Sequence, residues 1–120
     1  MVTGGLDVES CRTAIERELR RPQRPTAIFA ASYVATLGAI KAIRAVGLDL
    51  PGDVSLLGID DADWMEALHP YISAVAQPVE QMAAEAWRLL NQRLGGGTAK
   101  SARIRLPCTL HVRESTRPVQ

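Results

Sequence analysis

The sequence predicts an α/β fold built on a parallel sheet, and three consecutive segments predict it. Residues 26–31 form a short apolar run between a proline and a helical pattern, which is typical of a buried parallel strand. Residues 34–46 repeat apolar side chains every three residues, as in a helix that buries one face. Residues 54–59 are again continuously apolar. Strand, helix and strand make a right-handed βαβ unit, so both strands end at one edge of the sheet, where α/β proteins bind ligands.

Capping and turn signals place the other elements. Asp7 can cap a helix whose apolar positions recur at three and four residues, and Gly47 supplies a left-handed stop for the helix over residues 34–46. Further expected elements are a helix after Asp7, a helical turn after Asp63, a strand at residues 73–76, a helix from Pro78 to Leu94 that ends at three glycines, and strands at residues 103–106 and 109–112. Met82 and Trp87 are expected on the core-facing side of the helix from Pro78 to Leu94.

The composition is that of a soluble globular protein, with 47% hydrophobic and 22% charged residues among 120. A net charge of +1 and an aromatic content of 4% favour neither nucleic acid nor a membrane as a direct partner. The sequence shows no charged-then-apolar leader and no long apolar run. We therefore expect a cytoplasmic protein in which Cys11 and Cys108 are reduced.

Motifs for enzyme chemistry are missing from the sequence. It contains no GxSxG, HExxH, P-loop or CxxC pattern. His69 and His111 lie apart from any acidic or cysteine cluster at metal-ligand spacing. The glycines at residues 95–97 follow a helix and do not lead from a strand into one, so they form no phosphate loop. We expect no catalytic residues, no metal and no cofactor.

Three blocks of the sequence resemble the end of the effector-binding domain of lactose-repressor/galactose-repressor (LacI/GalR) family transcription regulators. In the family's order they are PTAIFAASYVATLGAIKAIRAVGLDLPGDVSLLGIDD, QPVEQMAAEAWRLL and LPCTLHVRESTRP. The resemblance covers residues 25–118. The tail RESTRP resembles a specific family signature, which secreted sugar-binding proteins of the same fold do not usually carry.

The resemblance implies a three-layer, doubly wound, mainly parallel sheet like that of the type I periplasmic-binding proteins. Residues 1–120 would be a C-terminal fragment of the effector-binding and dimerisation domain, mostly its C-terminal lobe, with the DNA-binding headpiece absent. The helix from Val79 to Leu94 and the strand at residues 103–106 would belong to the N-terminal lobe.

The implied function is the sensing of a sugar or sugar-like effector by a homodimer, which changes operator binding through a headpiece outside this chain. One alternative is a solute-binding protein of a sugar transport system. A second is a small enzyme of the doubly wound class.

Asp60 is the first candidate for the effector site. A carboxylate at the carboxyl end of a buried strand can accept two hydroxyl hydrogen bonds, as vicinal sugar hydroxyls require. Alternatively, Asp60 or Asp61 caps the turn that begins near Asp63. The resemblance implies that the first acidic residue of the block Gly58, Ile59, Asp60 and Asp61 contacts the effector.

Ser32, Trp64 and Gln77 complete the candidate effector site. Ser32 stands after the first strand where most relatives carry an asparagine, and its alternative role is the N-cap of the next helix. Trp64 can stack on a sugar ring or serve packing or an interface. Gln77 resembles a position where the chain crosses between the two lobes, and its alternative role is that of a hinge residue.

The resemblance also places a dimer interface on the helix over residues 34–46, at Leu37 and Ile40, and around Leu68.

In the tail, Arg113 and Glu114 are expected to form a local ion pair.

Overall fold

The computed structural model of the chain describes residues 1–96 and 102–118. The chain divides into two units, which are described separately. Unit 1 comprises Met1–Ala76 and Leu110–Gln120, and unit 2 comprises Gln77–Thr109. The helices and strands are α1 (Val8–Leu19), β1 (Ala27–Phe29), α2 (Tyr33–Ala45), β2 (Ser55–Ile59), the 3-10 helix η1 (Asp63–Glu66), β3 (Ser73–Ala76), α3 (Val79–Leu94) and β4 (Thr109–His111).

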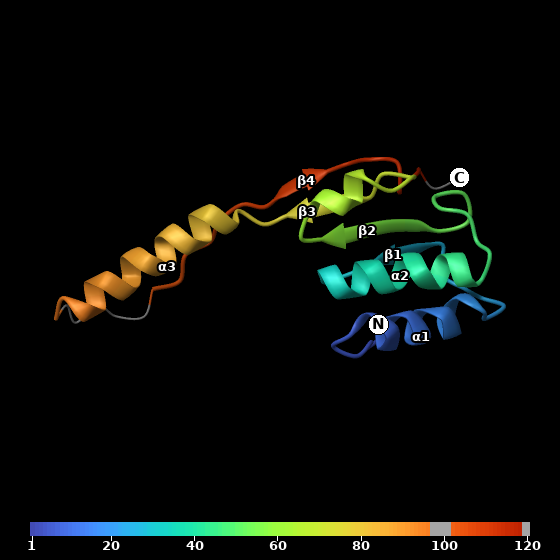
Figure 1. The fold of residues 1–120 in the computed structure, drawn as a ribbon, viewed down its shortest axis with the longest axis horizontal. Coiled ribbons are helices and arrows are strands. Elements are labelled where there is room, and N and C mark those ends of the chain that lie inside the picture. Colours follow the sequence, from blue (N-terminus) through green and yellow to red (C-terminus); the bar gives the residue numbers. More distant parts are fainter. Residues whose placement is uncertain (97–101, 119–120) are drawn as a thin grey trace. The chain divides into compact units, whose positions relative to one another are not determined.

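The strands form one sheet in the order β1-β2-β3-β4 (Figure 1). β1 pairs with β2 in parallel, with Ala27 opposite Ser55. β2 pairs with β3 in parallel, with Leu57 opposite Ser73. The predicted βαβ unit is confirmed, and β1 and β2 end at the same edge of the sheet. We call this edge the carboxyl edge.

Unit 1 shows two of the three expected layers among its described residues, in keeping with a partial lobe. α2 packs against the sheet, and α1 lies beside α2 (Figure 1). Because right-handed crossovers in the strand order β1-β2-β3 all run over the same face, α2 and η1 cover one face together. Phe29 points to the opposite face and is 59% exposed. The third layer is therefore not supplied by the described part of unit 1.

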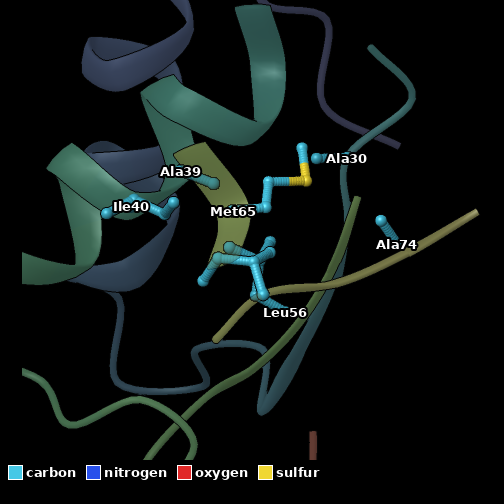
Figure 2. Close-up of a cluster of buried hydrophobic side chains, with 7 residues drawn as sticks. Ala30, Ala39, Ile40, Leu56, Met65 and Ala74 are labelled. Carbon is cyan, nitrogen blue, oxygen red and sulfur yellow. The ribbon is translucent and has the colours of Figure 1, made fainter. Parts of the chain in front are cut away.

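The core of unit 1 lies between α2 and the strands. A first cluster of buried side chains joins α2, the sheet and η1, and Figure 2 shows it: Ala30, Ala39, Ile40, Leu56, Met65, Ile72 and Ala74. A second cluster joins α1 to α2: Leu19, Ala42, Ile43 and Val54. Met65 is fully buried, so the short helix η1 is anchored to the core by its own side chain.

Local signals explain where the helices of unit 1 begin and end. Asp7 caps α1 as predicted, and its side chain accepts a hydrogen bond of 2.8 Å from the Ser10 backbone N–H. Gly47 follows α2 with a φ of +71°, which is the left-handed stop that its position predicts.

Unit 2 corrects two expectations. α3 has the predicted bounds, but none of its residues is buried, and Trp87, expected in a core, is 63% exposed. Residues 103–106 form no strand. A strand needs a hydrogen-bonding neighbour, and the described part of unit 2 offers residues 103–106 only a helix. Of the three glycines expected after α3, Gly97 lies outside the described residues.

Candidate functional site

Asp60 directly follows β2 at the carboxyl edge and has an unusual backbone conformation. Its φ is +67°. Among residues 1–96 and 102–118, every other residue with a positive φ is a glycine. Aspartate tolerates this left-handed region better than most residues. The Asp60 backbone N–H donates to the Val75 carbonyl oxygen of β3 at 3.1 Å. The backbone at Asp60 is thus fixed by the neighbouring strand, directly after the sheet ends.

Ser32 follows β1 at the same edge and is the N-cap of α2. Its Oγ accepts a hydrogen bond of 3.1 Å from the Ala35 backbone N–H. The capping role that the sequence allowed is therefore confirmed. The hydroxyl hydrogen of Ser32 can still be donated to another acceptor, since a serine hydroxyl both donates and accepts.

Trp64 lies in η1, directly after the carboxyl edge. It is partly buried and packs against the first core cluster, which confirms the packing role considered for it. Its ring meets the ring of Tyr33 edge to face, with centroids 5.7 Å apart and an interplanar angle of 84°. Among the described residues, the buried indole Nε1 has no hydrogen-bond partner.

Tyr33 is a candidate site residue that the sequence analysis did not predict. It is the first residue of α2 and is 41% exposed. The available signal was an aromatic residue directly after the helix cap, at a position where α/β proteins bind ligands.

Asp61 pairs with Arg113, and this corrects two expectations. Arg113 Nη1 and Nη2 donate to the two carboxylate oxygens of Asp61 at 2.7 and 2.8 Å. The N-cap position of η1 is Ala62, with no side-chain cap bond, so neither Asp60 nor Asp61 caps this turn. The expected partner of Arg113, Glu114, instead accepts a hydrogen bond of 2.8 Å from the Tyr71 backbone N–H.

Arg113 fastens the connection between β2 and β3. It also donates to the Ile72 carbonyl oxygen at 2.7 Å and to the carboxylate of Glu66 at the end of η1. Its hydrogen bonds hold the pKa of Asp61 below the ordinary value, against the opposing effect of burial. The tail thereby holds the segment that carries Asp60 and Trp64 against the sheet.

Ser115 links β2 to β3 through hydrogen bonds. It is fully buried, its Oγ donates to the Leu56 carbonyl oxygen at 2.6 Å, and it accepts from the Ser73 backbone N–H at 2.7 Å. The Leu56 backbone N–H donates to the Ser115 carbonyl oxygen at 2.8 Å. The tail signature RESTRP is therefore hydrogen-bonded to the sheet through Ser115, a role that its polar composition does not reveal.

The structure brings only some of the predicted site residues together. Ser32, Asp60 and Trp64 all lie at or directly after the carboxyl edge of unit 1. Gln77 begins unit 2, so its part in the site stays a prediction.

The predicted interface residues differ in their surroundings. Ile40 and Leu68 line one groove of about 200 Å³ between α2 and the segment after η1. Ile40 is only 3% exposed, because it is packed in the first core cluster, so it can contribute only the floor of an interface. Leu37 and Leu68 are partly buried.

Two further expectations concern metals and membranes. Residues 1–96 and 102–118 contain no group of three or more His, Cys, Asp or Glu side chains that could hold a metal ion. Within the same ranges, no helix combines the length and the apolar character that crossing a membrane requires.

Comparison with known proteins relates this geometry to a family. A family model described as a periplasmic binding protein-like domain matches residues 3–116. The HTH-type transcriptional regulator CelR of Thermobifida fusca is 38% identical over 112 residues, which cover 93% of this chain and 33% of that protein. Catabolite control protein A of Priestia megaterium is 31% identical over 117 residues, which cover 98% of this chain and 35% of that protein.

Solved structures give the same answer for the fold. A complex of the transcriptional regulator CelR with cellobiose aligns with a TM-score of 0.84 at 37% identity, covering 94% of this chain and 35% of that chain. A LacI family transcriptional regulator from an Arthrobacter species, in complex with lactose, aligns with a TM-score of 0.80 at 28% identity, covering 95% of this chain and 43% of that chain.

The chain spans about a third of the length of the curated relatives it matches. The match over residues 3–116 and the regulators that align with nearly the whole chain lead to one assignment. The chain belongs to the periplasmic binding protein-like domain family and is homologous to the effector-binding domain of LacI-family transcription regulators.

Proposed function

We propose that this chain is the C-terminal part of the ligand-sensing domain of a LacI-type transcription regulator and that its effector is a sugar or sugar-like molecule. The observation that carries the proposal is Asp60, whose left-handed backbone is held by β3 at the carboxyl edge. Its carboxylate accepts vicinal hydroxyls there, beside the N-terminus of α2. Ser32, Trp64 and Gln77 are the other proposed contacts.

The names of the relatives support a transcription regulator over a solute-binding protein of a transport system and over a small enzyme. CelR and catabolite control protein A are named as regulators, and two solved relatives carry cellobiose or lactose. In this proposal the protein acts in the cytoplasm, catalyses no reaction and contacts its operator through a headpiece outside these residues. A transport protein, in contrast, would bind the same sugars without any operator.

The effector role of Asp60 is tested by Asp60→Asn in the complete gene product, with cellobiose and lactose as ligands in calorimetric titration. Asparagine keeps the shape and tolerates a positive φ, so the change removes the charge without adding backbone strain. Loss of charged hydrogen bonds worth about 1.5 to 3 kcal/mol should lower affinity about tenfold to a hundredfold.

The matched control is Asp63→Asn, an exposed carboxylate three residues along the same connection, which should leave affinity unchanged. Asp61 is unsuitable as a control because it pairs with Arg113. A folded Asp60→Asn protein with wild-type affinity would overturn the role of Asp60. Failure of the wild-type protein to bind either sugar would count against a sugar effector.

Self-association is the second part of the proposal. Leu37 and Leu68 would contribute apolar surface to a homodimer, and the groove floored by Ile40 would lie within the contact. We expect Leu68→Lys to convert the dimer to a monomer in light scattering, because a lysine ammonium group is costly to bury. Exposed Leu94→Lys on α3 is the control, and unchanged dimers in both variants would contradict this interface.

A further inference from the structure

An aromatic pair bridges the two connections that leave the carboxyl edge. Tyr33 begins the connection after β1, and Trp64 lies in the connection after β2. Their rings meet edge to face at 5.7 Å, a favourable geometry for two aromatic rings. Two segments that are 31 positions apart in the sequence therefore hold each other's rings at the edge where Asp60 lies.

The two rings differ in burial, and the difference indicates their roles. Trp64 packs on the first core cluster, which fixes its orientation. Tyr33 is 41% exposed and keeps part of its ring in contact with solvent. Trp64 thus supports Tyr33, and Tyr33 presents an aromatic surface outward.

The indole of Trp64 adds an independent observation. Its Nε1 is buried and has no acceptor among the described residues. A buried donor without a partner destabilises a protein, so such donors are rare unless a water or a ligand completes them.

We propose that Tyr33, supported by Trp64, is a specificity-determining residue that stacks on the C–H face of a pyranose ring. This inference rests on the proposed function and names the class of effector. A pyranose offers hydroxyls along its edge and C–H groups on its face, so it matches a carboxylate and an aromatic ring presented together. An open-chain polyol offers similar hydroxyls but no rigid C–H face.

The test compares Tyr33→Phe and Tyr33→Leu in the complete gene product, titrated with cellobiose and with sorbitol. Leucine keeps an apolar contact with Trp64 but has no flat ring, so cellobiose affinity should fall about tenfold. Phenylalanine keeps the ring and should retain cellobiose affinity. Sorbitol binding should be weaker than cellobiose binding, and Tyr33→Leu should remove most of that preference.

Tyr71→Leu is the matched control. Tyr71 is 38% exposed and stacks on His69 with ring centroids 4.5 Å apart, so it resembles Tyr33 in exposure and in having a ring partner. It should change thermal stability without changing cellobiose affinity.

The outcomes separate this inference from the proposed function. If Asp60→Asn weakens cellobiose binding while Tyr33→Leu does not, the stacking role is wrong and the effector site stands. If Tyr33→Phe loses as much affinity as Tyr33→Leu, the hydroxyl group acts and the ring face does not. Absence of sugar binding by the wild-type protein overturns both proposals.

Discussion

Arg113→Met is expected to lower the free energy of unfolding by about 3 kcal/mol, the lower end of the range for breaking a buried ion pair. The Arg113 and Asp61 side chains are only 12% and 18% exposed, and Arg113 donates to both oxygens of that carboxylate. Methionine keeps most of the apolar stem but leaves Asp61 and the Ile72 carbonyl oxygen without their donor. The loss is measured by urea denaturation at pH 7.

The difference between the wild-type protein and Arg113→Met should depend on pH. Because Arg113 lowers the pKa of Asp61 in the folded state, the ion pair stabilises the fold fully above the unfolded pKa of about 4. This stabilisation is lost as the pH falls through the lowered, folded-state pKa. The two unfolding free energies should therefore converge on acidification below about pH 4.

Arg24→Met provides the control for Arg113→Met. Arg24 pairs with Asp53 at 3.3 Å in the same unit, but the side chains are 39% and 40% exposed. Exposed pairs contribute about 0 to 1 kcal/mol, so Arg24→Met should cost little. Equal losses in the two variants, or a loss at Arg113 that does not vary with pH, would contradict the role assigned to the Arg113–Asp61 pair.

The sequence predicted those parts of the fold that local signals determine. The cap at Asp7 and the stop at Gly47 act within one helical turn, so α1 and α2 could be placed from the sequence. Residues 103–106 have an alternating pattern, but a strand depends on a neighbour that the pattern cannot reveal. The same limit applies to Trp87, since helical periodicity identifies an apolar face and not what covers it.

In the candidate site too, local signals predicted some residues, whereas contacts between distant parts of the sequence were not predicted. Ser32 and Asp60 were predicted because a polar residue directly after a buried strand lies at the carboxyl edge in any parallel sheet. The partner of Arg113 was not predicted, because Asp61 lies 52 residues away while Glu114 is adjacent in the sequence. Ser115 lies in a stretch of ordinary polar composition. Only the three-dimensional structure shows that it is buried and hydrogen-bonded to both β2 and β3.

Gly38→Val is expected to lower the free energy of unfolding by about 3 kcal/mol, at the upper end of typical overpacking effects. Gly38 lies at a close approach of α1 and α2: a Cβ atom there would stand 2.7 Å from Cys11 Cβ and 3.0 Å from both the Arg12 nitrogen and the Val8 oxygen. Two of these three atoms belong to the α1 backbone, so a rotamer change cannot relieve the contact. The helices would have to separate, and the second core cluster between them would loosen.

Helix propensity opposes this overpacking effect. The sign of the change in unfolding free energy caused by Gly38→Ala shows which of the two effects is larger. In an exposed helix interior, glycine to alanine stabilises by about 1 kcal/mol. At Gly38 the same change should destabilise, because its Cβ meets the α1 backbone. The matched control is Ala45→Gly at the exposed end of α2, which should cost about 1 kcal/mol or less from propensity alone. A stabilised Gly38→Ala protein in thermal unfolding would show that α1 can move away from α2 at little cost, and that the close approach at Gly38 does not hold the two helices in place.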